Sequence, residues 1–175
     1  MRITEATPTD IAQVLRVERD AFGDDETVEL VTELIDDPTA KPLLSLVAWQ
    51  GDRAVGHIMF TAASLEGAPG LSVSILAPLA VIHAWQGQGV GGGLIEEGVS
   101  RLARDGVELV FVLGHPGYYP RHGFSSAIPQ GLLAPYPISP EEAWMVRALR
   151  PGILGEVTGV VACARALDRP ELWRE

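Results

Sequence analysis

The chain has 175 residues, of which 47% are apolar, 23 are acidic and 13 are basic, so its formal net charge at pH 7 is −10. This length is typical of a single domain, and the apolar fraction is sufficient for a sizeable core. The acidic balance and the scattered arginines argue against nonspecific nucleic-acid binding, which needs a basic face to neutralise phosphates. We therefore expect one domain spanning residues 1–175.

The single cysteine, Cys163, excludes an intramolecular disulfide and a cysteine-rich zinc site. It lies in an apolar run, which is typical of a buried thiol without a chemical role. The first residues do not form a signal peptide, because Glu5 and Asp10 stand where an apolar run would be needed. Residues 67–95 lack Asp, Glu, Lys and Arg, but Pro78 and several glycines leave no apolar piece of about 18 residues. These features predict a cytoplasmic protein without a membrane partner.

Two amphipathic helices are predicted after a short first strand over residues 2–6. Residues 7–10 (Thr-Pro-Thr-Asp) supply an N-cap, a proline in the first turn and an acid three residues after the cap. Apolar residues recur at helical spacing up to Gly23, which ends the first helix. The second helix follows residues 24–25 and stops before Pro38.

Three strands are expected next, over residues 43–50, 54–65 and 72–82, with a tight turn at Gly51-Asp52 between the first two. The third run is almost wholly apolar, which is typical of a central strand. Pro78 interrupts this run, so we expect a bulge or kink there.

The later elements complete a mixed sheet. A helix is expected from the glycine-rich segment to about residue 105, and residues 108–113 predict a strand parallel to the previous one. Residues 122–140 predict an ordered but irregular segment, and residues 144–150 and 157–164 predict closing strands. On the long helix, five apolar residues are expected to face inward: Leu94, Ile95, Val99, Leu102 and Ala103. The element order predicts an α/β fold with a mixed central sheet and flanking helices.

The glycine-rich segment, residues 86–93, is the most informative part of the sequence. It follows an apolar strand and opens a helix, so backbone amides and the helix N-terminus are placed to bind an anion without any Lys or Arg. Three interpretations are open: a dinucleotide-binding G-x-G-x-x-G loop over residues 87–92, an acetyl-coenzyme A loop, and a turn whose glycines serve only close packing. The dinucleotide interpretation is disfavoured, because four residues separate the strand from Gly87 and the next strand ends in Leu113-Gly114-His115, with no acid for a ribose.

Two spaced motifs resemble the GCN5-related N-acetyltransferase (GNAT) superfamily. The family signature Gln/Arg-x-x-Gly-x-Gly/Ala after a strand matches Gln86-x-x-Gly89-x-Gly91, and the later Tyr-x-x-x-Gly-Phe matches residues 119–124. Residues 78–81 and 113–119 further resemble the bacterial subgroup of N-acetyltransferases similar to YhbS, in which the resemblance runs nearly end to end. The resemblance implies a single GNAT-like domain whose mixed sheet contains a splayed strand, with acetyl-coenzyme A as cosubstrate.

The resemblance also implies roles for individual residues. The main chain of the splayed strand would contact the pantetheine arm and the thioester carbonyl, and the amides of the loop would bind the pyrophosphate. Tyr119 would protonate the departing thiolate, the alternative being a packed core tyrosine, and Tyr118 is expected to point elsewhere. The implied cofactor-binding residues are Leu79, Ala80, Val81, Gly87, Gln88, Gly89, Val90, Gly91 and Gly92.

Two departures from the family leave functions unassigned. A glutamate on the central strand often serves as base, but residues 76–82 contain none, so the base remains open among His83, His115, Glu26 and Glu66. The cofactor 3′-phosphate also lacks a cationic partner within the motif. The four histidines share no metal-ligand spacing, so no metal is predicted.

The sequence thus predicts an acetyl-coenzyme A-dependent N-acetyltransferase that acts on a primary amine of a small molecule or peptide by direct attack in a ternary complex. The alternative is a non-catalytic acyl-coenzyme A-binding sensor or interaction module on the same fold. Residues 22–26 and the proline-rich segment after Phe124 are expected to flank the acceptor entrance, where the acids 24–26 would suit a cationic amine or merely cap the second helix. The oligomeric state stays open, with a homodimer as one candidate.

Overall fold

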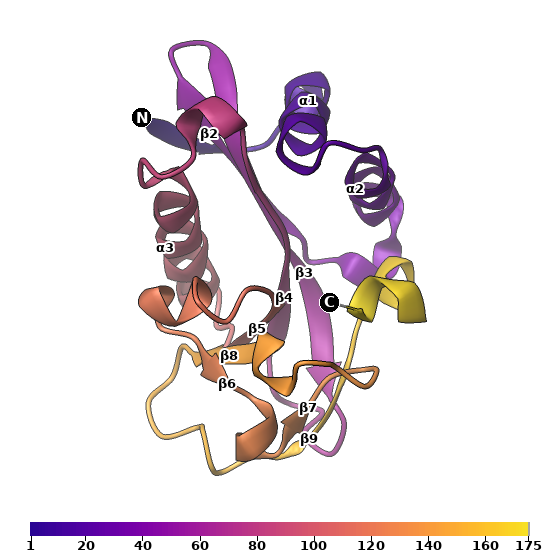
Figure 1. Ribbon diagram of the computed structural model, residues 1–175. Helices are drawn as coiled ribbons and strands as arrows, with labels where there is room; N and C mark the ends of the chain where they lie inside the picture. The colour runs from indigo at the N-terminus through magenta and orange to yellow at the C-terminus, as the bar shows by residue number, and fades with distance from the viewer. Residues whose placement is uncertain (175) are drawn as a thin grey trace.

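A strongly twisted mixed sheet separates two layers of helix in the computed structural model, which describes residues 1–174 (Figure 1). The main strands follow the order β1-β2-β3-β4-β5-β8-β6, with β7 and β9 continuing from the far end of β3. The strands are β1 (Arg2–Glu5), β2 (Leu44–Gln50), β3 (Arg53–Leu65), β4 (Val73–Val81), β5 (Leu109–Leu113), β6 (Ser125–Ser126), β7 (Leu132–Leu133), β8 (Trp144–Ala148) and β9 (Gly159–Ala162).

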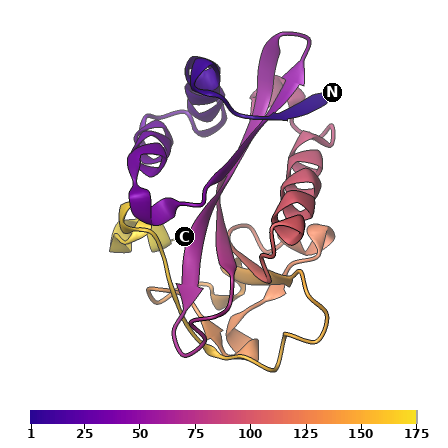
Figure 2. The same cartoon turned by 180° about the vertical axis from the view of Figure 1, so that it is seen from behind.

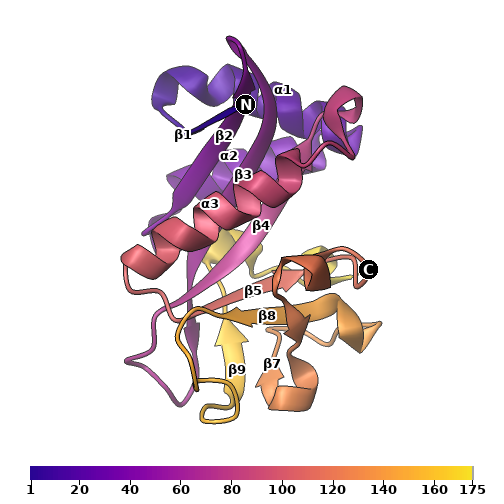
Figure 3. The same ribbon diagram turned by 90° about the vertical axis from the view of Figure 1, so that its left-hand side faces the viewer.

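The three α-helices cover opposite faces of this sheet. Helices α1 (Ile11–Phe22) and α2 (Glu26–Asp36) lie on one face, and α3 (Val90–Arg104) lies on the other, as the front and back views show (Figures 1 and 2). Viewed from the side, α3 runs diagonally across the strands (Figure 3). Helix α1 ends at Gly23, whose φ of +74° suits a glycine after a helix and whose N–H donates to the Arg19 carbonyl.

Small residues let α3 approach the sheet closely. A Cβ at Gly56 on β3 would lie 2.7 Å from a methyl group of Val90 and 2.9 Å from one of Leu94. A Cβ at Gly98 would collide with the ring of Phe60. The start of α3 is therefore fixed against the middle of the sheet, because neither position has room for a side chain.

The sheet opens where β4 and β5 diverge. These strands pair in parallel only from Val73 to Leu76 on β4. Beyond Leu76 the register of β4 against β3 shifts, so that Ala77 and Pro78 together face Met59. This bulge confirms the expected irregularity at Pro78, since proline cannot donate a ladder hydrogen bond. After it, β4 follows β3 and leaves β5.

A buried polar cluster joins α1 to the sheet. The imidazole Nδ1 of His57 lies 2.6 Å from a carboxylate oxygen of Glu18, and its Nε2 lies 2.8 Å from the Ser45 hydroxyl. Both Glu18 and His57 are fully buried. Burial raises the pKa of the Glu18 carboxyl, and the hydrogen bond and charge of His57 act in the opposite direction. The cluster ties α1 to β3 at a position where an unpartnered polar group would be costly.

The predicted fold class is confirmed, with differences in detail. The first helix begins as a 3₁₀ turn over Pro8–Asp10, and the irregular segment contains the short strands β6 and β7. The inward placement of Ala103 is wrong: it is exposed, because it lies about 100° around the helix from buried Leu102. Among residues 1–174 no helix is long and apolar enough to cross a membrane.

Candidate functional site

A cavity of about 830 Å³ lies at the divergence of β4 and β5. One wall comes from the end of α1 and the start of α2, through Phe22, Thr27 and Leu30. The opposite wall comes from the loop before α3 and from the segment after β5. The cavity is therefore lined by both helix layers, with the gap in the sheet between them. Its volume suits a small-molecule site, for which about 300–1,000 Å³ is usual.

The loop before α3 presents backbone rather than side chains to this cavity. Gly87 and Gly89 have φ of +76° and +86°, and a Cβ at either position would meet no protein atom within 4 Å. The first N–H groups of an α-helix lack intrahelical partners, so those of Val90, Gly91 and Gly92 are available to a ligand. Open space and helix polarity together make this loop suitable for an anion.

Tyr119 begins the 3₁₀ turn Tyr119–His122, just after β5. Its ring is buried, with edge-on contacts to Tyr118 at 5.1 Å and to Phe124 at 5.7 Å between centroids. Gly114 is needed beneath it, because a Cβ there would overlap the Tyr119 ring. Tyr119 also lines the cavity.

Tyr118 lines the same cavity, so the expectation that it points elsewhere is wrong. Its hydroxyl lies directly against Gly91, where a side chain would collide with it. Burial raises the pKa of the Tyr118 phenol, with the charge of Arg121 opposing this, so the phenol is a proton donor at neutral pH. Tyr118 precedes the turn and reaches across to α3, and the sequence carried no signal of this direction.

Two further residues of the turn, Arg121 and His122, line the cavity, and Arg121 supplies positive charge that the sequence analysis did not find. Arg121 lines the cavity, with its guanidinium 5.7 Å from the centre of the Tyr118 ring and its Nε donating to the Gly117 carbonyl at 3.2 Å. His122 lies against Gly92, so close that a Cβ there would come within 2.8 Å of its ring. The motif Tyr-x-x-x-Gly-Phe contains both residues at its variable positions, which is why the pattern did not distinguish them.

The structure places the four candidate bases in different surroundings, and only His115 lines the cavity. His115 lines the cavity, but its Nδ1 accepts a hydrogen bond from the Gly117 N–H at 3.0 Å. His83 lies outside the lining and contacts Asp20 through its backbone N–H, at 2.8 Å, and its Nδ1, at 3.2 Å. This backbone hydrogen bond is the main reason why the pKa of Asp20 is lowered. Glu66 follows the far end of β3, where its N–H donates to Val160, and Glu26 lies outside the lining.

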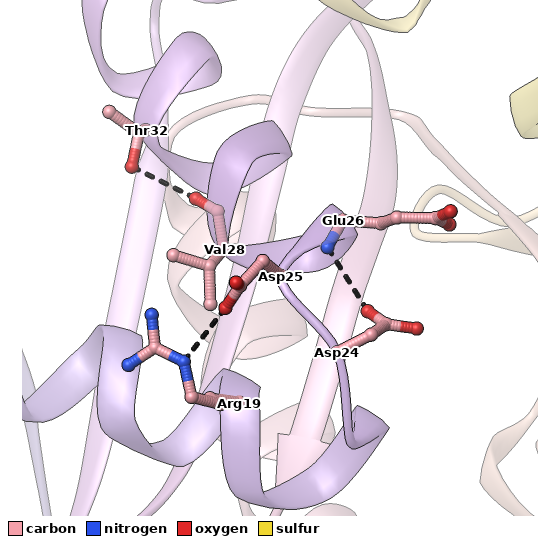
Figure 4. A network of polar contacts seen from close by, with 6 residues as sticks. All are labelled: Arg19, Asp24, Asp25, Glu26, Val28 and Thr32. Atoms are coloured by element: carbon pink, nitrogen blue, oxygen red, sulfur yellow. Dashed lines mark hydrogen bonds and ion pairs between the residues drawn. The ribbon is translucent and has the colours of Figure 1, made fainter.

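The acids between α1 and α2 hold the helix junction together (Figure 4). Asp24 accepts a hydrogen bond from the Glu26 N–H at 3.1 Å, and Asp25 pairs with Arg19 at 2.8 Å. None of the acids 24–26 belongs to the cavity lining. The structure therefore favours the helix-capping alternative for Asp24, whereas the Asp25 side chain makes an ion pair with Arg19 and no cap hydrogen bond.

The cavity brings together most of the predicted cofactor-binding residues. Ala80 and Gln88 are not part of the lining: Ala80 is buried in the sheet, and the Gln88 amide donates to the Ala84 carbonyl at 3.2 Å. The predicted residues that line the cavity are Leu79, Val81, Gly87, Gly89, Val90, Gly91, Gly92 and Tyr119.

Two other sequence predictions concern Cys163 and metals. Cys163 is half-buried, and burial raises the pKa of its thiol to about 11. Such a thiol is a poor nucleophile at neutral pH. In the described part of the chain, no group of three or more His, Cys, Asp or Glu residues is arranged to hold a metal ion.

Comparison with known proteins gives consistent matches. A family model described as an acetyltransferase (GNAT) domain matches residues 42–126. The chain is 46% identical to the uncharacterized N-acetyltransferase YjhQ of Escherichia coli strain K12, over 89% of this chain and 88% of YjhQ. It is 32% identical to the uncharacterized N-acetyltransferase YhbS of the same strain, over 92% of this chain and 95% of YhbS.

Two solved structures share both the fold and about a third of the sequence. The crystal structure of YhbS from Escherichia coli in complex with coenzyme A matches with a TM-score of 0.88 and 31% identity, covering 96% of this chain and 92% of that chain. A GNAT family acetyltransferase from Brucella melitensis in complex with acetyl-coenzyme A matches with a TM-score of 0.77 and 30% identity, covering 95% and 97%.

Proposed function

Because the chain belongs to the GNAT family of N-acetyltransferases, we propose that it transfers the acetyl group of acetyl-coenzyme A to a primary amine by direct attack in a ternary complex. The observation that carries the proposal is the single cavity in which the divergent strands, the glycine-rich loop and Tyr119 meet. The two relatives of about 30% identity whose structures were determined with coenzyme A or acetyl-coenzyme A support the choice of donor.

The phosphates of the donor are assigned to the loop from Gly87 to Gly92. Its open backbone and the N-terminus of α3 supply N–H donors and about half a positive charge. Arg121 adds a cationic partner that the loop itself lacks. These features fit a ligand that carries several phosphate charges.

The acyl end of the donor is assigned to the gap between β4 and β5. Among the described strands, β4 has no partner beyond Leu76 on the side away from β3, so main-chain groups of Leu79 and Val81 on that side can contact an extended amide-containing arm, whereas those of Ala80 face His57 on β3. One of these groups is occupied within the protein, since the Val81 carbonyl accepts from the Gln86 amide at 3.0 Å. The apolar side chains of Leu76, Leu79 and Leu113 line the same gap and suit the methylene groups of the arm.

Tyr119 is assigned as the general acid. Attack by an amine on the thioester develops an oxyanion and then expels a thiolate, which a phenol can protonate. The resemblance of residues 119–124 to the family motif selects Tyr119, and its place in the cavity lining agrees with this role. Tyr118 is the second phenol in reach of the cavity and is the necessary control for the assignment.

The proposal is tested by measuring free thiol release from acetyl-coenzyme A with a panel of primary amines. Amine-dependent release, with the acetylated amine identified by mass spectrometry, is the expected result. The alternative function, a module that holds acyl-coenzyme A without turnover, predicts tight binding by calorimetry but no amine-dependent release. Absence of coenzyme A binding would contradict both.

A further inference from the structure

We infer that the acceptor is a weakly basic amine carried on an apolar body, of which the α-amino group of an apolar amino-acid amide or peptide is the typical case. This inference rests on the proposed acetyl transfer and goes beyond it by naming the class of acceptor. It is carried by three features of the cavity as residues 1–174 form it: its apolar wall on the α1 and α2 side, the absence of carboxylate side chains from the lining, and the engagement of Nδ1 of His115 by a backbone N–H.

The wall that faces away from the phosphate loop is apolar. Phe22, at the end of α1, is 47% exposed, although it is a large aromatic side chain. Together with Leu30 on α2 and Pro78 on β4, it forms the side of the cavity that the loop before α3 does not cover. Thr27 is the polar side chain of α2 in this lining. Such a wall favours a ligand with an apolar body, because burying apolar surface is the main source of binding free energy there.

A polycationic acceptor would lack partners in this cavity. Within residues 1–174, the lining contains no Asp or Glu side chain. Four acids lie close in sequence to this wall: Asp24 and Asp25 are engaged in a hydrogen bond and an ion pair, and Glu26 and Glu29 lie outside the lining. The charged side chain of the lining is Arg121, which would repel a polyamine. The acidic side chains that give the chain its net charge of −10 therefore lie outside the described lining of the cavity.

The described lining also lacks an evident base. Nδ1 of His115 already accepts a hydrogen bond from the Gly117 N–H at 3.0 Å. His122 lies at Gly92, on the phosphate side of the cavity. The Tyr118 phenol remains protonated at neutral pH, because burial raises its pKa. This lining therefore favours an acceptor amine that reaches the site already neutral.

This preference selects among amines by their basicity. At pH 7 a lysine-type amine, with a pKa of about 10.4, is neutral in roughly one molecule in 2,500. An α-amino group, with a pKa of about 7.8, is neutral in roughly one molecule in 7. The concentration of reactive amine thus differs about 300-fold at equal total concentration. Lower intrinsic nucleophilicity of the weaker base offsets part of this advantage.

The test compares three acceptors by kcat/KM for thiol release: phenylalaninamide, phenethylamine and spermidine. The first two share an aromatic ring and differ mainly in amine basicity. At pH 7 we expect phenylalaninamide to exceed phenethylamine by about tenfold or more, and the ratio to shrink steadily as the pH is raised to 9.5, because the neutral fractions converge. Effects of pH on the enzyme itself cancel in this ratio. We expect spermidine to be the poorest acceptor at both pH values.

A matched pair of variants tests the place of the acceptor. Thr27 is in the first turn of α2, where an acidic residue is compatible with the helix dipole. Thr27→Glu should raise kcat/KM for spermidine relative to phenylalaninamide about fivefold, whereas Thr27→Gln should leave this ratio near the wild-type value. An unchanged ratio in a folded Thr27→Glu protein would show that this wall does not contact the acceptor and would overturn the inference.

The outcomes separate the acceptor class from the transfer reaction. Preference for spermidine at pH 7, or a phenylalaninamide-to-phenethylamine ratio that does not change with pH, would overturn the inference while leaving acetyl transfer intact. Failure of all three amines to release thiol, in a protein that binds coenzyme A, would overturn the proposed function as well.

Discussion

Replacement of Gly89 tests the anion-binding loop with a predictable cost in stability. Its φ of +86° is unfavourable for any residue with a Cβ, so Gly89→Ala should lower the free energy of unfolding by about 1–2 kcal/mol. For a chain of this length that corresponds to a fall in Tm of roughly 2–8 °C. No protein atom lies within 4 Å of the added Cβ, so the fold should survive. Gly89→Val extends the side chain further into the space assigned to the pyrophosphate, and coenzyme A affinity should fall about 30-fold or more, equivalent to about 2 kcal/mol.

The matched control is Gly106, just after the other end of α3. Its φ is +88°, and a Cβ there would also meet no protein atom within 4 Å, but it is not part of the cavity lining. Gly106→Val should therefore show a similar loss of Tm with unchanged coenzyme A affinity by calorimetry. Equal affinities in folded Gly89→Val and Gly106→Val proteins would refute the assignment of the phosphates to this loop.

Three further predictions concern other residues. Tyr119→Phe should keep the fold and coenzyme A affinity but lower kcat about 10²- to 10⁴-fold. A larger loss of kcat in Tyr118→Phe would instead identify Tyr118 as the general acid. Arg121→Gln should weaken coenzyme A binding about tenfold. If Arg121 contacts the pyrophosphate, dephospho-coenzyme A binding should weaken equally; if Arg121 contacts the 3′-phosphate, only coenzyme A binding should weaken. Unchanged binding of both ligands would exclude Arg121 from the phosphate site. Glu18→Leu should lower the free energy of unfolding by about 1–3 kcal/mol, because it leaves the His57 ring without its buried partner. Glu18→Gln retains a hydrogen-bond acceptor, so it should lower the free energy of unfolding less, as measured by urea unfolding. Similar losses in both variants would contradict this account.

The parts of the site that sequence analysis predicted are those encoded in local patterns. The glycine-rich loop was recognisable because its glycines are dense in sequence and precede a helix start, and in the structure a Cβ at Gly89 would meet no protein atom within 4 Å. The bulge at Pro78 was predictable because proline interrupts a strand wherever it occurs. Tyr119 followed from a spaced motif, and its place in the cavity lining agrees with the sequence prediction.

The parts that were missed depend on how elements meet in space. Glu18 and His57 are 39 residues apart and come from different layers, so their contact had no local signal. The direction of the Tyr118 side chain depends on the short turn that follows β5. If this turn began one residue earlier or later, the side chain would point to a different part of the structure. Nothing in the sequence distinguished Arg121 from the other arginines, because its place in the cavity lining depends on the turn that contains it. The sequence left two roles open for the acids 24–26, because the hydrogen bond of Asp24 and the ion pair of Asp25 depend on how the two helices meet.

The central claim is that acetyl-coenzyme A occupies the cavity between β4 and β5, with its phosphates on the amides that begin α3. It is tested most directly by titrating the ¹⁵N-labelled protein with coenzyme A and following each backbone amide by NMR. The account predicts the largest shifts at the amides of residues 87–92, together with changes in Leu79 to Val81 and in the turn from Tyr119. Saturable binding that leaves the amides of residues 87–92 unmoved, or shifts there with NADH and none with coenzyme A, would contradict it.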